Sequence, residues 1–297
     1  MEILPQLLIF AVITSAIYML VAAGLTLTFG VLEFINFAHG DVAMLGSYVF
    51  FWLYILMDLG IVPAFILTAL LIAIFGILME RTTFKPVRDR QEFIPLVLSV
   101  GVAIFLQAAV IFTFGADSKN YSKGESSQVF QLFDGRASIT MSQIAIILSS
   151  IIILTILGTW LKKSKTGKAI RAVSDDKSVA AIVGINVDRT ITILFAIGSM
   201  LAGIAGLLLA FDQNLNPKMG LMLSVKGFAA LIIGGVGNFG GAILGAIIIG
   251  FSEVLITGLT PIPSGYRDSI TFVLLVIVLL WRPYGILNPS KEQAESR

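Results

Sequence analysis

The 297-residue sequence contains no cysteine and only one histidine. Because cysteine is absent, disulfides, thiolate metal sites and thiol nucleophiles are all excluded. The single histidine, His39, has no cluster of carboxylates around it in the sequence and is a poor metal site, and no Ser/His/Asp arrangement identifies a nucleophile. We therefore expect no bound metal, no cofactor and no enzymatic activity.

Charged side chains are also scarce. They make up 13% of the sequence, whereas 57% of the residues are hydrophobic, and the mean hydropathy is +0.96. This composition excludes an ordinary soluble protein and indicates an integral membrane protein that is surrounded by lipid. The formal net charge of +2 is small, so nothing indicates a nucleic-acid partner.

Nucleotide-binding motifs are missing or incomplete. Gly167-Lys168 is followed by Ala169 and does not complete a GxxxxGK[ST] loop, so this chain lacks the means for P-loop ATP hydrolysis. Any ATP-driven step then needs another subunit. The run GVGNFG from Gly235 to Gly240 has the spacing of a dinucleotide-binding fingerprint but no βαβ context and no acidic residue about 20 positions on. A tight turn, or close packing of helices on small residues, explains this run better.

Long apolar runs dominate the rest of the chain. A helix needs about 20 apolar residues to cross a hydrocarbon core of about 30 Å, and long uninterrupted runs argue against a β-barrel. The fold class is therefore all-α, a polytopic membrane protein with eight or nine transmembrane helices, some broken or re-entrant, in one domain over residues 1–297. The expected spans are residues 6–29, 42–57, 61–79, 93–114, 141–161, 191–211, 219–234, 241–259 and 269–281.

A polar segment, residues 162–190, orients the protein. It carries seven basic and three acidic residues, and short connections with such an excess of lysine and arginine stay in the cytoplasm. Residues 116–140 and the N-terminus then lie outside, and the tail after Arg282 returns to the cytoplasm. A second basic connection should share the cytoplasmic side; its basic residues are Arg81, Lys85, Arg88 and Arg90.

Two segments interrupt the helical pattern, residues 29–46 and 227–250. Each is apolar enough to lie at membrane depth, yet each contains polar or glycine-rich backbone that needs protein or a water-filled cavity around it. Paired interruptions of this kind favour a repeat-built transporter whose pathway passes the breaks. The candidate pathway residues are Asn36, His39, Gly40, Asp41, Gly235 and Gly237.

A structural interpretation of the first break stays open beside this one. Asn36, His39 and Asp41 could satisfy backbone groups at a helix break, with Asp41 capping the next helix, or they could contact the solute. Glu33 and Glu253 also fall close to membrane depth, or at an interface, and the sequence shows no ion partner for either.

The second half of the polar segment reads SVAAIVGIN from Ser178 to Asn186. Ala180, Ala181 and Gly184 predict a small-residue surface on a short helix that stops at Gly184. Such a helix is suited to docking in a cleft of another protein. A solvated basic loop attracted to anionic lipid is the alternative.

Three segments, read in order, carry a family resemblance: FGVLEFINFAHGDVAMLGSY, then AVSDDKSVAAIVGINVDRTITILFAIGSMLAGIAGLLLA, then GFAALIIGGVGNFGGAILGAIIIG. In this order they resemble the permeases of high-affinity branched-chain amino acid ABC transporters. Gly240 stands where many members have a proline before a Gly-Ala pair. Urea permeases look similar around INFAHGD, which leaves urea or another small solute as an alternative substrate.

The resemblance implies a multi-pass subunit of a bacterial or archaeal cell inner membrane. It further implies alternating access driven by two cytoplasmic ATPase subunits, together with a sister permease and an extracytoplasmic solute-binding protein. An ion-coupled carrier or channel, with Asp41 or Glu33 as the coupling acid, is a different class that would need no ATPase. The resemblance makes residues 162–190 a cytoplasmic coupling loop; its candidate contacts are Asp175, Lys177, Ala180, Ala181, Gly184 and Asn186.

Overall fold

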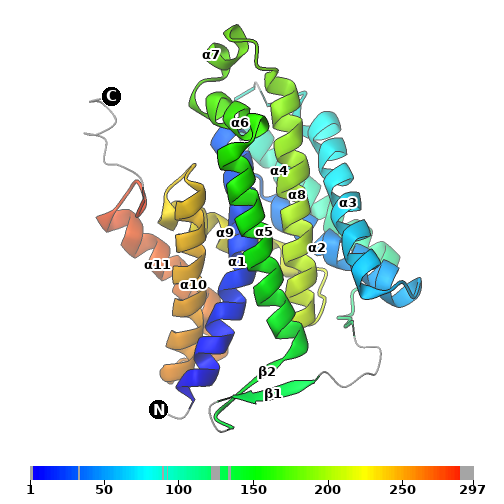
Figure 1. Ribbon diagram of the computed structural model, residues 1–297, viewed down its shortest axis with the longest axis vertical. Helices are drawn as coiled ribbons and strands as arrows, with labels where there is room; N and C mark the ends of the chain where they lie inside the picture. Colours follow the sequence, from blue (N-terminus) through cyan, green and yellow to red (C-terminus); the bar gives the residue numbers. More distant parts are fainter. Residues whose placement is uncertain are drawn as a thin grey trace.

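The computed structural model describes residues 3–32, 34–88, 90–91, 93–121, 128–132 and 135–287, which form a helical bundle with one small hairpin (Figure 1). Glu33, expected near membrane depth, lies outside the described residues. The helices are α1 (Leu4–Leu32), α2 (Ala38–Phe51), α3 (Ile61–Met79), α4 (Phe93–Phe114), α5 (Met141–Lys163), α6 (Lys165–Asp175), α7 (Lys177–Ile182), α8 (Val187–Asp212), α9 (Met219–Gly234), α10 (Phe239–Leu259) and α11 (Arg267–Trp281). Turns of π-helix extend α2 to Leu56 and α3 to Phe84, and a 3₁₀ turn (Ser264–Tyr266) precedes α11.

The all-α prediction is confirmed, and each of the nine expected spans coincides with a helix. Within the described residues, seven helices are long and apolar enough to cross a membrane. The shorter apolar helix α9 and the 15-residue helix α11 coincide with the two remaining expected spans. The antiparallel hairpin of β1 (Val129–Leu132) and β2 (Ala137–Thr140) was not expected. Its four-residue strands are too short to show the alternating pattern that identifies a strand in a sequence.

Helices α1, α2, α8 and α9 form the centre of the bundle. In α8, 72% of the most apolar stretch is buried, compared with 22% in α5 on the periphery. A helix that is apolar on all sides and buried by its neighbours belongs to the interior. Small residues bring α2 and α8 together: Gly46 packs on Gly203, and a side chain at Gly206 would overlap the carbonyl of Ala43. Such contacts let helix backbones approach closely in lipid.

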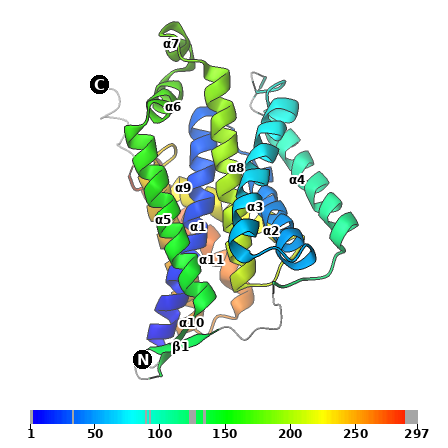
Figure 2. The same cartoon turned by 45° about the vertical axis from the view of Figure 1, so that its right-hand side comes forward.

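The bundle has two distinct ends. Helices α6 and α7 extend beyond one end, whereas the start of α1 and the hairpin lie at the other (Figure 1; Figure 2 gives a second view). Lys85 and Arg88 both pair with Asp188 at the start of α8, so the two basic connections share an end as predicted. The chain after α11 returns to this end, where the amide of Leu287 donates to the carbonyl of Gly234 at 3.0 Å.

Both predicted interruptions are present, but they differ in position. The first separates α1 from α2, and α2 starts inside the bundle: His39 packs against Gly24, which lies eight residues before the end of α1, about 12 Å along the helix axis. The second is a tight turn over residues 235–238 at the α6 end of the bundle. Gly235 and Gly237 have φ values of 113° and 78° there, a conformation that favours glycine.

Candidate functional site

The break before α2 is held by serine hydroxyls from two other helices. The amide of Gly40 donates to Ser224 Oγ of α9 at 2.6 Å, and Ser224 Oγ donates to the carbonyl of Phe37 at 2.7 Å. On the other side, the amide of Phe37 donates to Ser99 Oγ of α4 at 3.1 Å. Backbone groups exposed by a helix break at membrane depth need such partners, so α4 and α9 together allow the break.

Asn36 and Asp41 have different roles at this break. Asn36 Oδ1 accepts from the amide of Ala38 at 3.1 Å, which supports the structural interpretation of this residue. The prediction that Asp41 caps the helix is wrong, because α2 begins at Ala38 after Phe37 and has no side-chain cap. Asp41 lies in the first turn instead, where Oδ1 accepts from Gln107 Nε2 of α4 at 2.9 Å.

Two polar atoms at the break are buried without a partner. His39 is 2% exposed and Asp41 is fully buried. Within the described part of the chain, His39 Nε2 and Asp41 Oδ2 make no hydrogen bond. A buried polar atom without a partner is costly, and such groups inside a membrane gather along solute and ion pathways. These two atoms are therefore the strongest candidates for contact with a solute.

The predicted pathway residues fall into two groups. Asn36, His39, Gly40 and Asp41 lie together beside the first turns of α9, where Gly220 packs on Asp41. Gly235 lies at the other end of α9, 15 residues further on, which is about 22 Å along a helix. Gly237 packs near Gly30 of α1. Helix α9 thus joins the two groups but does not bring them into contact.

The predicted coupling segment forms two short helices. Asp175 ends α6, and Asp176 caps α7 by accepting from the amides of Ser178 and Val179 at 2.7 and 2.9 Å. The helix stop at Gly184 is confirmed by its φ of 87°. Asn186 then caps α8 by accepting from the amide of Arg189 at 2.9 Å.

The exposed face of α7 differs from the predicted one. Ala180 is only 1% exposed and faces the protein, so it does not belong to the predicted small-residue surface. The other two residues of that surface, Ala181 and Gly184, are exposed, and Lys177 is half-buried. The outer face instead carries large apolar side chains, Val179, Ile182 and Val183. Exposed apolar residues on a helix that extends beyond the bundle make this face a candidate for contact with another protein or with the membrane surface.

An ion cluster lies beneath α7 and connects α8 to α3. Arg88 Nη1 lies 3.3 Å from Glu80 Oε1, and the same guanidinium pairs with Asp188. Glu80 also accepts from Thr192 Oγ1 of α8 at 3.0 Å. Because Glu80 is fully buried, this cluster fixes the first turns of α8 to the end of α3.

A second cluster, in which Lys226 and Glu253 are buried, joins four helices. Lys226 Nζ of α9 lies 2.9 Å from Tyr18 Oη of α1, 3.1 Å from Glu253 Oε1 of α10 and 2.8 Å from Asp268 Oδ1 of α11. Glu253 also accepts from Thr271 of α11. Buried charges need such partners. The sequence predicted that Glu253 lies near membrane depth but did not identify its ion partner. Lys226, a lysine within the apolar run of α9, was the feature that could have indicated this partner.

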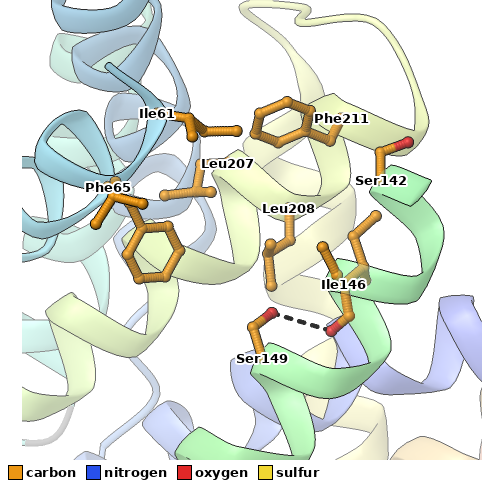
Figure 3. Close-up of a pocket in the computed structure, with 10 residues that line it drawn as sticks. Ile61, Phe65, Ser142, Ile146, Ser149, Leu207, Leu208 and Phe211 are labelled. Atoms are coloured by element: carbon orange, nitrogen blue, oxygen red, sulfur yellow. Dashed lines mark hydrogen bonds between the residues drawn. The ribbon is translucent and has the colours of Figure 1, made fainter. Parts of the chain in front are cut away.

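An apolar pocket of about 330 Å³ opens between α3, α5 and α8 (Figure 3). Ile61 and Phe65 of α3 face Leu207, Leu208 and Phe211 of α8 across it. The one hydrogen bond drawn there joins Ser149 to the carbonyl of Ile146 in its own helix, at 3.1 Å. The lining therefore offers hydrocarbon surface and no charge that could orient a polar solute.

The family model for "Branched-chain amino acid transport system / permease component" matches residues 7–279, nearly the whole chain. This chain belongs to that permease family. It is therefore a multi-pass membrane protein of a transport system, in agreement with the apolar helices described above.

Similar permeases come from bacteria and an archaeon. The high-affinity branched-chain amino acid transport system permease protein LivH of Salmonella typhimurium is 35% identical, over 91% of each chain. The corresponding BraD of Pseudomonas aeruginosa is 34% identical over 95% of each chain. A probable branched-chain amino acid transport permease protein LivH of Methanocaldococcus jannaschii is 33% identical, over 93% of this chain and 90% of that protein.

The fold also resembles a solved structure, PsaBC from Streptococcus pneumoniae in complex with Fab. The TM-score is 0.51 over 97% of this permease and 94% of that chain, at 12% identity. At this identity the likeness concerns the fold alone.

The sequence did not predict the roles of Ser99, Gln107 and Ser224 in this permease, because lone polar residues in apolar spans give no signal of what they contact.

Proposed function

We propose that this chain is the membrane-spanning permease subunit of an ABC importer that carries branched-chain amino acids across the cell inner membrane. The observation that carries the proposal is the similarity to permeases named for this substrate, 35% identity over 91% of both chains for LivH of Salmonella typhimurium. The chain forms one permease domain over residues 1–297. It carries out no catalysis itself, because separate ATPase subunits drive the transport.

The ATPase subunits dock on the loop over residues 162–190. Two observations support this part. Helices α6 and α7 extend beyond the bundle (Figure 2), and α7 exposes Val179, Ile182 and Val183. The candidate contacts Asp175, Lys177, Ala181, Gly184 and Asn186 lie on or beside this helix, whereas the buried Ala180 supports it from within.

The solute passes the break between α1 and α2. This assignment is supported by the two unpartnered buried atoms, His39 Nε2 and Asp41 Oδ2, which stand beside Asn36 and Gly40. Gly235 and Gly237, at the far end of α9, form the cytoplasmic limit of the same pathway.

The way in which α8 is attached supports alternating access. The ion cluster of Arg88, Glu80 and Asp188 lies at the start of α8, next to α7. Further along, Gly203 of α8 packs directly on Gly46 of α2. A displacement of α7 by an ATPase is therefore passed along α8 to the helix that carries the candidate pathway residues.

The partners are a sister permease, two cytoplasmic ATPase subunits and an extracytoplasmic solute-binding protein, in a lipid membrane and without nucleic acid. The test is uptake of radiolabelled leucine, isoleucine, valine and urea by proteoliposomes that hold the complete transporter. Uptake of the three amino acids that stops with an inactive ATPase subunit is expected. Uptake of urea alone would replace the substrate, and uptake without ATPase subunits would overturn the ABC mechanism in favour of a carrier.

A further inference from the structure

A polar cavity of about 660 Å³ lies at the end of the bundle opposite α6 and α7. It is bounded by the first turns of α1, α5 and α11 and by the last turns of α8 and α10. Under the orientation set by the basic connections, this is the extracytoplasmic end. The volume is in the range of small-molecule sites, and no part of the candidate pathway near α2 contributes to it.

Two opposite charges face this cavity from different helices. Asp212 ends α8, and its Oδ1 accepts from Gln143 Nε2 of α5 at 3.3 Å. Arg267 begins α11, and its Nη2 donates to Thr14 Oγ1 of α1 at 3.2 Å. A neutral side chain thus helps to hold each of the two charged groups at the cavity wall.

Asp212 and Arg267 do not pair with each other. The ion partner of Arg267 is Glu253, whose Oε2 lies 3.3 Å from Arg267 Nε. Among the described residues, Asp212 has no cation within ion-pair distance, although Arg267 is near enough to act on it electrostatically. A separated carboxylate and guanidinium on one wall complement a molecule that carries an ammonium and a carboxylate close together.

The remaining wall of the cavity is apolar. Leu7 and Phe10 of α1 and Val254 of α10 line it, and Leu7 and Val254 are largely buried. This combination of two opposite charges and a hydrocarbon wall matches an α-amino acid with an aliphatic side chain. By contrast, the pocket in Figure 3 is lined by no charged side chain.

We propose that this cavity is an extracytoplasmic binding site for a zwitterionic aliphatic α-amino acid. Arg267 receives the carboxylate, Asp212 receives the ammonium group, and the apolar wall receives the side chain. The choice of a branched aliphatic side chain rests on the proposed function, whereas recognition of the zwitterion rests on Asp212 and Arg267.

The absence of native cysteine allows a direct test on the complete transporter in nanodiscs. Thr257→Cys places one thiol in the cavity wall, and Thr260→Cys places one on exposed surface nearby. Leucine at roughly ten times its dissociation constant should slow modification of Thr257→Cys by a methanethiosulfonate about tenfold, because labelling follows the empty fraction. Modification of Thr260→Cys should not change.

Leucine analogues and charge variants identify the groups that recognise the zwitterion. Leucinamide lacks the carboxylate and 4-methylpentanoate lacks the amine, and neither should protect Thr257→Cys. Asp212→Asn and Arg267→Gln should each remove protection by leucine. Lys218→Gln and Asp117→Asn are matched controls, because each removes one charge from exposed surface outside the cavity and should retain protection. Protection by both analogues, or protection that persists in Asp212→Asn, would overturn the proposal.

Parallel uptake assays separate this proposal from the proposed function. Leucine uptake without protection of Thr257→Cys would overturn the site and leave the function intact. Protection without leucine uptake would support the site and overturn the transport assignment. Arg267 also contacts Glu253, so its variant could lose stability; Asp212→Asn, whose only described side-chain partner is Gln143, keeps the test decisive.

Discussion

Gly40 of α2 and Ser224 of α9 are joined by a hydrogen bond of 2.6 Å from the Gly40 amide to the Ser224 hydroxyl. The same hydroxyl donates to the carbonyl of Phe37. One side chain therefore satisfies the amide of Gly40, which the first turn of α2 leaves free, and also bonds the carbonyl of the N-cap residue Phe37 at the place where the chain breaks inside the bundle. The break depends on α9, although α9 lies more than 180 residues further along the sequence.

Ser224→Ala should destabilise the permease by about 1–3 kcal/mol, because it leaves the buried amide of Gly40, in the first turn of α2, without a partner. Thermal unfolding of the purified transporter in detergent measures this change. Ser150→Ala is the matched control: Ser150 is also fully buried, but its hydroxyl has no hydrogen-bond partner in the described structure. Equal melting temperatures for the two variants would refute the bridging role of Ser224.

Arg88→Gln should lower the stability by about 3 kcal/mol, since it leaves the buried Glu80 without its cation. Lys85→Gln removes a half-exposed partner of Asp188 and should cost about 0–1 kcal/mol. Adding Glu80→Gln to Arg88→Gln should restore part of the loss, because no unpaired charge then remains buried. A double variant that is less stable than Arg88→Gln would contradict this account of the cluster.

Ile182→Asp should abolish co-purification of the ATPase subunits and leave the melting temperature of the permease unchanged. The reason is that Ile182 is 83% exposed on α7 and contributes little to the fold. Val129→Asp adds the same charge at an exposed apolar residue of the hairpin, at the opposite end of the bundle, and should retain the ATPase subunits. Retention of the ATPase by Ile182→Asp would remove α7 as the docking helix.

Lys226→Met and Glu253→Gln should each destabilise the protein more than the two changes together. Each single change leaves the cluster of Lys226, Glu253, Arg267 and Asp268 with one uncompensated charge, whereas the double variant is neutral. Removing one member of a buried ion pair costs about 3–5 kcal/mol. A double-mutant cycle on melting temperatures measures the coupling; simple additivity would show that the charges act independently.

Membrane topology could be predicted because it depends on local composition. Each span can be recognised by its length and apolar content. The excess of lysine and arginine in residues 162–190 predicts which connections share a side of the membrane. The contact of Arg88 with Asp188 agrees with that prediction. The end of the short helix at Gly184 could also be predicted, because it depends on the backbone conformation of one residue.

The candidate site was predicted only in part. The chain around Asn36 and His39 was recognised as a break, but Ser99 and Ser224 were missed, because which polar residue meets the break depends on how separate helices pack. The exposed face of α7 was also misjudged at Ala180, since a six-residue helix is too short for a periodic pattern to show which side is buried.

The sequence by itself determined that this is an all-α membrane protein with eight or nine apolar spans, two interruptions and a basic end. These features follow from hydrophobicity, charge and backbone freedom within single segments. The tertiary structure alone decided that Gly235 lies far from Asp41, that Lys226 meets Glu253, and that Asp212 and Arg267 face one cavity. Such relationships join residues from different helices, and in lipid they are set by the packing of small residues and the pairing of buried polar groups.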